Sequence, residues 1–333
     1  MQQRTLTDGG ITRDVSTLCL GTMYFGTTVN EQTAFAILDR YVDAGGNFVD
    51  TANCYTFWVD GGAGGESEQV LGRWLRSRGN RDDLVIATKI GAGPREPDRP
   101  YDASNREGLS AEVREGLSAE VIEDEAHASL KRMGLDHVDL LYAHADDRQT
   151  RLEETTDAFG RLVEAGDAGL VAASNHTTWR LALARRIAEE RGMPRYAAIQ
   201  QRHSYLEARH LREHPPDAVQ LPITPELLDY ARSTVDLAVL GYSVLLSGAY
   251  TRPDRPLPED YDTAGAPARL AMLDKVAAEL DATPNQVVLA WMMGGDPPII
   301  PLLGVSSVEQ LDECLGAADL HIDQELRDRL DEA

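Results

Sequence analysis

Residues 18–26, LCLGTMYFG, decide between the two folds that the rest of the chain allows. They carry an apolar strand into its first turn. In a doubly wound, dinucleotide-binding sheet this turn would hold the glycine pattern G-x-G-x-x-G. The stretch has glycines at Gly21 and Gly26 only, so the pattern is absent. The turn therefore favours the other arrangement of alternating strands and helices, a (β/α)8 barrel.

Strand and helix patterns alternate along the whole chain. Apolar strands are predicted over 17–20, 47–50, 84–89, 137–144, 169–173, 197–200, 237–242 and 298–303. Helices are predicted over 31–44, 67–79, 118–133, 152–165, 178–191, 225–233, 284–293 and 307–315. The strands are apolar on both faces, as parallel strands covered by helices are. Eight such units suit a (β/α)8 TIM barrel spanning 1–333 as one domain, with a doubly wound sheet as the alternative.

The composition limits the classes of function. The 333 residues carry a net charge of −23, which argues against a nucleic-acid partner because phosphates would be repelled. No apolar run is long enough to span a membrane, and the start MQQRTLTDGG lacks the apolar core of a signal peptide. A cytoplasmic location is therefore expected. The three cysteines have no metal-like spacing and are expected to be reduced.

Two segments interrupt the alternation. The sequence REGLSAEV occurs twice in tandem, at 106–113 and 114–121. The second copy leads into a predicted helix, so the first is expected to lengthen the preceding loop at little entropic cost. The proline-rich segment 251–267 is predicted to be a long loop after the seventh strand. Long rim loops are thus part of the predicted barrel.

Polar residues leave the predicted strands at the end where barrel enzymes collect their chemistry. The second to seventh strands lead into Asp50, Lys89, His144, Ser174, Gln200 and Tyr242. Lys89 is unusual because only three of the 32 cationic residues are lysines, and this one closes the apolar run LVIATK. An unpaired charge is costly to bury. Lys89 is therefore expected to have a partner.

Asp50, Tyr55, Lys89 and His144 would form a proton-donating site if they met on one rim. A phenol has a pKa near 10, and a nearby ammonium stabilises the phenolate and lowers that pKa. The carboxylate would hold the ammonium in place, and a lysine supplies a compact charge where arginine would bring a planar fork. His144 would orient a carbonyl oxygen or relay the proton.

The order of these residues resembles that of the aldo-keto reductase superfamily over nearly the whole chain. The matching segments are FVDTANCY (48–55), VIATK (85–89), SLKRMGLDHVDLLYAH (129–144), AASN (172–175), GYSVLLSG (241–248) and IIPLLGVSSVEQLDECLG (299–316). The resemblance implies reversible hydride transfer between a nicotinamide and a carbonyl, with Tyr55 as general acid. It also implies an N-terminal β-hairpin in 2–14.

The resemblance implies a set of cofactor-binding residues as well. They are Gly21, Thr22, Met23, Asp50, Ser174, Asn175, Gln200, Tyr242, Ser243, Leu245, Ser247, Gly248, Gly304, Ser306 and Gln310. Residues 302–314 lack the cation that often pairs with a 2′-phosphate in the family, and Cys314 replaces a common asparagine. NADP(H) remains the preferred expectation, with NAD(H) close behind. Tyr24, Phe25, Phe57 and Trp58 would wall the substrate pocket.

Other functions are compatible with parts of the sequence. A nicotinamide-binding, redox-sensing regulatory subunit is the main alternative to a carbonyl reductase. A metal-dependent barrel isomerase is the third hypothesis, but His144 has no further histidine and carboxylate set at strand ends, so no metal is expected. The expected partner is a small carbonyl compound, such as a keto sugar or an aromatic carbonyl.

Overall fold

Eight parallel strands close into a barrel in the structure of the protein, a computed structural model that describes residues 1–96, 113–209 and 220–333. The barrel strands are β3 (Cys19–Gly21), β4 (Phe48–Asp50), β5 (Val85–Ile90), β6 (Val138–Ala143), β7 (Ala168–Ser174), β8 (Tyr196–Arg202), β9 (Ala238–Tyr242) and β10 (Ile299–Gly304). They pair in chain order, and β10 closes the ring against β3. The predicted (β/α)8 barrel is confirmed.

A two-stranded hairpin closes one end of the barrel, as predicted. Strands β1 (Gln3–Asp8) and β2 (Ile11–Ser16) pair antiparallel. Gly9 and Gly10 both have positive φ, the backbone that a two-residue hairpin loop of type I′ requires. Leu6 and Val15 are buried in the core inside the barrel, together with residues of all eight barrel strands. The hairpin therefore acts as the floor of the barrel.

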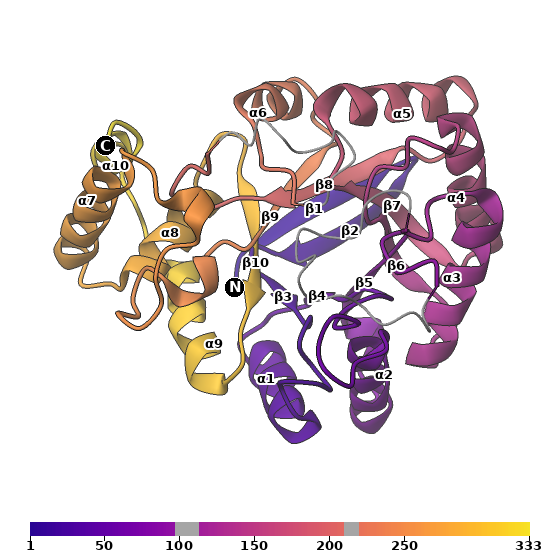
Figure 1. Ribbon diagram of the computed structural model, residues 1–333, viewed down its shortest axis with the longest axis horizontal. Coiled ribbons are helices and arrows are strands. Elements are labelled where there is room, and N and C mark those ends of the chain that lie inside the picture. The colour runs from indigo at the N-terminus through magenta and orange to yellow at the C-terminus, as the bar shows by residue number, and fades with distance from the viewer. Residues whose placement is uncertain (97–112, 210–219) are drawn as a thin grey trace.

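Helices surround the barrel (Figure 1). They are α1 (Glu31–Asp43), α2 (Glu66–Arg78), α3 (Ala119–Met133), α4 (Leu152–Ala165), α5 (Thr178–Glu190), α6 (Pro225–Arg232), α7 (Ala266–Glu279), α8 (Pro284–Met293), α9 (Val308–Leu315) and α10 (Gln324–Asp331). Short 3-10 turns lie at Arg81–Asp83, Leu246–Gly248, Glu259–Tyr261 and Gly316–Asp319. In Figure 1 the last four helices lie together on one side of the barrel.

Two of these helices, α7 and α10, were not among the predicted helices. Helix α10 buries only Leu330, so it has almost no apolar stripe to detect. Helix α7 begins at Ala266 and overlaps the last two residues of the loop predicted over 251–267. The first copy of the repeat lies outside the described residues except for its last residue, Val113. The second copy leads into α3 as predicted, with Ser118 accepting a hydrogen bond from the backbone of Val121.

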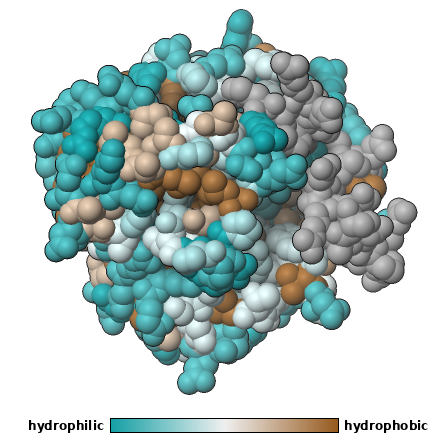
Figure 2. Space-filling model, turned by 60° about the vertical axis from the view of Figure 1, so that its left-hand side comes forward, coloured by the Kyte–Doolittle hydropathy of each residue, from teal (hydrophilic) through white to brown (hydrophobic). Residues whose placement is uncertain are grey.

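The surface is largely hydrophilic, in keeping with the high net charge. Figure 2 shows one face on which a strip of hydrophobic residues crosses a hollow in an otherwise hydrophilic surface. Within the described residues, none of the helices combines the length and the apolar character needed to cross a membrane.

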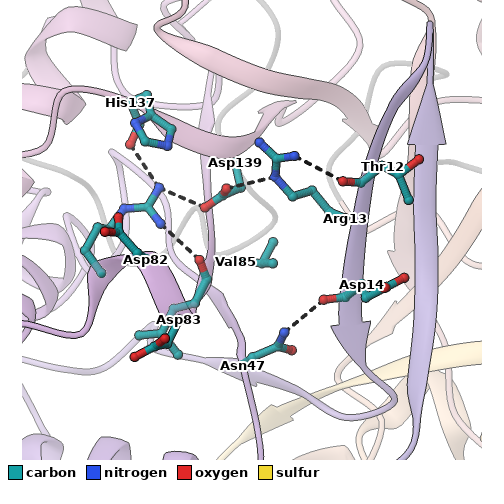
Figure 3. Close-up of a pocket in the computed structure, with 11 residues that line it drawn as sticks. Thr12, Arg13, Asp14, Asn47, Asp82, Asp83, Val85, His137 and Asp139 are labelled. Carbon is teal, nitrogen blue, oxygen red and sulfur yellow. Dashed lines mark hydrogen bonds and ion pairs between the residues drawn. The ribbon is translucent and has the colours of Figure 1, made fainter.

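A hollow of about 350 Å³ lies at the hairpin end of the barrel, away from the strand ends that carry the predicted chemistry. Its walls are β2, the start of β5 and the start of β6 (Figure 3). Asp139 lies at its centre, where one carboxylate oxygen accepts from Arg13 at 3.1 Å and the other from Arg81 at 2.8 Å and the backbone of Ile86 at 2.9 Å. These ion pairs anchor the hairpin to the barrel, so this hollow has a structural explanation.

Replacing Asp139 by Asn is expected to destabilise the fold without affecting the chemistry. Two arginines would lose a charged acceptor, since the amide that replaces it is neutral and keeps only one oxygen, and hydrogen bonds to charged groups are each worth about 1.5–3 kcal/mol. Because Arg13 is partly exposed, we expect a loss of about 2–3 kcal/mol in the free energy of unfolding, measured with urea. The matched control is Asp82→Asn, an exposed carboxylate on the same hollow. Equal stability of the two variants would show that the Asp139 ion pairs contribute nothing.

Candidate active site

The barrel brings Asp50, Tyr55 and Lys89 into direct contact. Asp50 is the last residue of β4, and Lys89 lies near the end of the neighbouring strand β5. The Lys89 ammonium donates to the Asp50 carboxylate, to the Tyr55 hydroxyl at 2.5 Å and to the backbone oxygen of Thr51 at 2.9 Å. The side chains of Lys89 and Asp50 are both 0% exposed. The partner expected for this buried lysine is thus a carboxylate and a phenol together.

His144 completes the group of four. It follows β6, and its backbone N–H donates to Ile90 of β5 at 2.9 Å. Its ring meets that of Tyr55 edge to face, with ring centroids 5.9 Å apart. Burial, followed by the positive charges of Lys89 and Arg114, holds the pKa of His144 well below its usual range. The imidazole is therefore neutral at physiological pH and can donate a hydrogen bond without carrying charge.

The pKa of Tyr55 shifts in the direction opposite to the one predicted. Burial raises it well above the usual value, and the negative charge of Asp50 raises it further. Burial likewise raises the pKa of Asp50, against the attraction of Lys89. The prediction of a lowered phenol pKa is wrong chiefly because it left out burial, and also because the Asp50 carboxylate places a negative charge beside the phenol. Tyr55 consequently stays protonated at neutral pH, and its proton remains available for transfer.

Three amide- and hydroxyl-bearing residues extend the site across the ends of β7 and β8. Gln200 donates to the second oxygen of Asp50 at 3.1 Å. Ser174 ends β7, and Asn175 follows it in a left-handed backbone conformation, φ 54°. The Asn175 amide donates to the backbone oxygen of His144 at 2.9 Å and to the Ser174 hydroxyl at 3.0 Å. These polar groups therefore form one continuous row beside the four residues above, and amides and hydroxyls are suited to a carboxamide ligand.

The side chain of Tyr242 joins this row from β9. Its hydroxyl donates to the Asn175 amide oxygen at 2.7 Å, and the backbone N–H of Gln220 donates to the same oxygen. Asn175 is therefore fixed by contacts on both ends of its amide. The Asn175 side chain would therefore already have a fixed orientation when a ligand binds to it.

The loop after β9 has an unusual backbone. Ser243, Leu246, Ser247 and Gly248 all have positive φ, between 48° and 92°. Such conformations are costly for residues other than glycine and persist mainly at binding sites. Turns of this kind also form concave groups of backbone N–H donors that bind anions. The loop fits the pyrophosphate role that the resemblance implies for Ser243, Leu245, Ser247 and Gly248.

The residues predicted at the adenosine end bond to one another. The backbone and hydroxyl of Ser306 donate to the Gln310 side chain at 2.8 and 3.1 Å, and Ser307 caps α9 by accepting from the backbone of Gln310. A side chain added at Gly304 would meet no atom within 4 Å, so the end of β10 is open. The open surface with its neutral serine and glutamine side chains suits an adenosine ligand, but residues 302–314 offer no positive charge.

Of the three residues predicted to bind the cofactor in the turn after β3, Thr22 uses its side chain inside the protein. Thr22 is buried, and its hydroxyl is used inside the protein, where it meets Ser67 at 2.7 Å and the backbone oxygen of Asp50 at 3.0 Å. Its side chain is not available to a cofactor. Gly21 ends β3 with the backbone of Leu303 3.1 Å from where a side chain would begin, so it allows close strand packing. Met23 follows in the same turn and is partly exposed.

Of the four aromatic residues predicted to line the substrate pocket, the structure buries one in the core. Phe57 and Trp58 pack edge to face with ring centroids 5.0 Å apart, and Phe57 covers a small apolar cluster of Cys54, Ala92 and Ala145. Tyr24 is 40% exposed, as a rim residue would be, whereas Phe25 is 1% exposed in the core between strands and helices. Phe25 is therefore corrected to a core residue, because its ring is buried in the cluster between strands and helices.

The sequence did not predict the hydrogen bonds that join Asn53, in the loop that carries Tyr55, to two glutamates. The Asn53 amide donates to Glu115 at 3.0 Å and to Glu125 at 2.9 Å. Glu115 also accepts from the backbone of Gly91 at 2.6 Å, so it ties the loops after β4 and β5 together. The only signal for Glu115 was its place in the second copy of the repeat, which was predicted only to lead into the following helix.

No group of three or more histidine, cysteine or acidic residues is placed to hold a metal ion among the residues that the structure describes. The closed barrel of eight parallel strands and the contact of Asp50, Tyr55 and Lys89 at one end of it are the features set beside known proteins. The model of the Aldo/keto reductase family matches residues 17–333, and the chain belongs to this family. It is an NAD(P)-dependent oxidoreductase, and the family supports carbonyl reduction as its general activity.

Named relatives cover most of the chain. An uncharacterized oxidoreductase, YrpG, of Bacillus subtilis is 32% identical over 94% of this chain and 90% of its own length. The norsolorinic acid reductase stcV of Emericella nidulans is 31% identical over 93% of this chain and 76% of its own. An aryl-alcohol dehydrogenase of Pestalotiopsis microspora is 28% identical over 93% of this chain and 77% of its own.

Proposed function

We propose that the protein reduces an aldehyde or ketone to an alcohol, reversibly, with Tyr55 as the proton donor. The contact of Tyr55 with Lys89, beside a neutral His144, is the observation that carries the proposal. The bound nicotinamide supplies the hydride. A regulatory subunit that only senses the cofactor would have no need of a protonated phenol held by a buried lysine.

Each of the four side chains has a distinct task in this proposal. Tyr55 gives its hydroxyl proton to the carbonyl oxygen as the C–H bond forms, and the resulting phenolate takes a proton back from solvent. The Lys89 ammonium stabilises the phenolate from 2.5 Å, and Asp50 holds that ammonium in place. His144 donates a hydrogen bond that orients the carbonyl oxygen.

The residues around the row of amides fit a nicotinamide cofactor. Ser174, Asn175 and Gln200 would bind its carboxamide, and the ring of Tyr242 would lie against the nicotinamide. The left-handed backbone of 243–248 would bind the pyrophosphate. Ser306, Ser307 and Gln310 would face the adenosine, with NADP(H) the preferred form and NAD(H) the alternative.

An aromatic carbonyl is the proposed substrate class. Phe57 and Trp58 follow Tyr55 in the same loop, and the exposed parts of their rings would offer aromatic surface to a substrate. One of the relatives, the aryl-alcohol dehydrogenase of Pestalotiopsis microspora, has a name that refers to aromatic chemistry. A keto sugar would instead require several hydrogen-bonding side chains on this wall.

A cofactor titration followed by a carbonyl panel tests this function. The protein is first titrated with NADPH and NADH, and the oxidation of each is then followed with aromatic aldehydes, aliphatic aldehydes and keto sugars. We expect turnover with aromatic aldehydes and little with keto sugars. Cofactor binding without turnover of any carbonyl would refute the enzyme proposal and favour the regulatory alternative.

The preference for NADPH over NADH is expected to be modest in the wild type, about tenfold or ~1.4 kcal/mol. Ser306 and Ser307 are neutral and the neighbouring Glu309 is negative, whereas charge-assisted hydrogen bonds are about twice as strong as neutral ones. Replacing Ser306 by Arg should therefore tighten NADPH by about tenfold and leave NADH nearly unchanged, as measured by fluorescence titration.

Arg252 offers a control for this prediction. It lies in the loop after β9 and pairs with Asp254 at 2.6 Å, so its charge is already engaged. Arg252→Gln should leave the cofactor preference unchanged. If the wild type instead prefers NADPH a thousandfold and Ser306→Arg adds nothing, another cation binds the 2′-phosphate, and loss of the preference in Arg252→Gln would identify it.

A further inference from the structure

Cys54, the residue before Tyr55, contacts the imidazole ring of His144. Its Sγ lies 3.6 Å from Nδ1 of that ring, which is a hydrogen-bonding distance for a sulfur atom. Cys54 is a free cysteine, 6% exposed, and it belongs to the small apolar cluster with Ala92 and Ala145. The contact between Cys54 and His144 therefore lies in an apolar environment, where a hydrogen bond is stronger than in water.

The thiol of Cys54 keeps its hydrogen at physiological pH. Burial raises the pKa of this thiol, and the negative charge of Glu115 raises it further. The Lys89 ammonium acts in the opposite direction, but its effect is smaller than that of burial. Cys54 therefore has an S–H group that can donate a hydrogen bond, and it does not carry the charge of a thiolate.

The partner at Nδ1 determines which nitrogen of the neutral His144 ring carries the hydrogen. A carboxylate or a backbone oxygen at Nδ1 would accept a hydrogen bond and would hold the N–H there. A thiol has an S–H to donate, and its sulfur is only a weak acceptor. Among the residues that the structure describes, none forms a hydrogen bond with the other ring nitrogen, Nε2, and the His144 side chain is partly exposed.

We propose that Cys54 is a positioning residue that donates its S–H to Nδ1 of His144 and so keeps the ring hydrogen on Nε2. This inference rests on the proposed carbonyl reductase function, in which His144 donates a hydrogen bond to the carbonyl oxygen. Because Nδ1 is engaged by the thiol, Nε2 is the nitrogen that meets this oxygen. The opposite tautomer would present a lone pair to the carbonyl oxygen, and two acceptors cannot form a hydrogen bond.

The tautomer of His144 can be measured by NMR of the full chain with isotope-labelled histidine. Correlations between the ring nitrogens and the carbon-bound ring hydrogens show which nitrogen carries a hydrogen. The His144 signal is the one that is missing from the spectrum of His144→Gln. We expect the wild type to hold one neutral tautomer, with the hydrogen on Nε2, both with and without oxidised cofactor. A wild type with the hydrogen on Nδ1 would overturn the inference.

Two variants that differ by one oxygen atom test whether Cys54 sets this tautomer. Cys54→Ser keeps a donor and should keep the hydrogen on Nε2, whereas Cys54→Ala has no donor and should populate both tautomers. Cys19→Ala is the matched control, because it removes another buried thiol, inside the barrel, and it should leave the His144 signal unchanged. If a folded Cys54→Ala variant held His144 entirely in the Nε2 tautomer, Cys54 would not be the residue that sets it.

Kinetics separate this inference from the proposed function. The kcat/KM for an aromatic aldehyde should fall about 3- to 10-fold in Cys54→Ala, as expected for the loss of one neutral hydrogen bond, and should recover in Cys54→Ser. The affinity for NADPH should be the same in all three proteins. If the wild type reduces no carbonyl, the reductase proposal fails, and the NMR measurement still decides the role of Cys54: hydrogen on Nε2 supports it and hydrogen on Nδ1 overturns it.

Discussion

Tyr55→Phe is expected to lose nearly all carbonyl reductase activity while it binds the nicotinamide cofactor almost as tightly as the wild type. The substitution removes only the phenolic proton that the mechanism transfers, and general acid catalysis is typically worth about 10²- to 10⁴-fold in rate. The ring stays in place because it packs edge to face with His144. The measurement is kcat with saturating cofactor, together with a fluorescence titration of the cofactor.

Tyr230→Phe is the matched control for this prediction. Tyr230 lies on α6, outside the candidate site, and the same hydroxyl is removed from a partly exposed ring. It should retain full activity. A Tyr55→Phe variant with wild-type kcat at saturating cofactor would show that another group donates the proton.

The barrel could be predicted from the sequence because its strands are short and apolar on both faces. The pattern identifies each strand even where the predicted and observed ends of the strand differ. The strand predicted over 197–200, for example, extends to Arg202 as β8. The extension carries Gln201 and Arg202, polar residues that pair with β9 and that no apolar pattern includes. Helix α10 could not be predicted from an apolar pattern, because it buries only Leu330.

The positions of the central side chains also followed from the sequence, because parallel strands bring their ends to one rim. The direction of the pKa shift of Tyr55 did not follow from the sequence. Whether Lys89 lowers the pKa of Tyr55 depends on how its ammonium is shared with Asp50 and on how deeply both are buried, and neither is encoded in spacing. Contacts between loops that are far apart in the sequence could not be predicted either, as the hydrogen bond from Asn53 to Glu115 illustrates.

Lys89→Met is expected to reduce activity about as severely as the loss of the phenol, and to destabilise the fold as well. The ammonium that stabilises the Tyr55 phenolate is lost, and so is the partner of the buried Asp50 carboxylate. Removing one partner of a buried ion pair typically costs about 3–5 kcal/mol. Urea unfolding measures this loss, and Lys131→Met, an exposed lysine on α3, should be nearly neutral in the same assay.

The destabilisation of Lys89→Met should depend on pH in one direction. Burial already raises the pKa of Asp50 with Lys89 present, and without the opposing ammonium that pKa rises further. Above the usual pKa of an aspartate, near 4, the unfolded chain releases this proton while the folded protein retains it, so stability falls as pH rises toward the raised pKa. The difference in unfolding free energy between wild type and variant should therefore be smallest near pH 4 and grow toward neutral pH. A difference that stays constant or shrinks as pH rises would show that Asp50 does not carry the uncompensated charge.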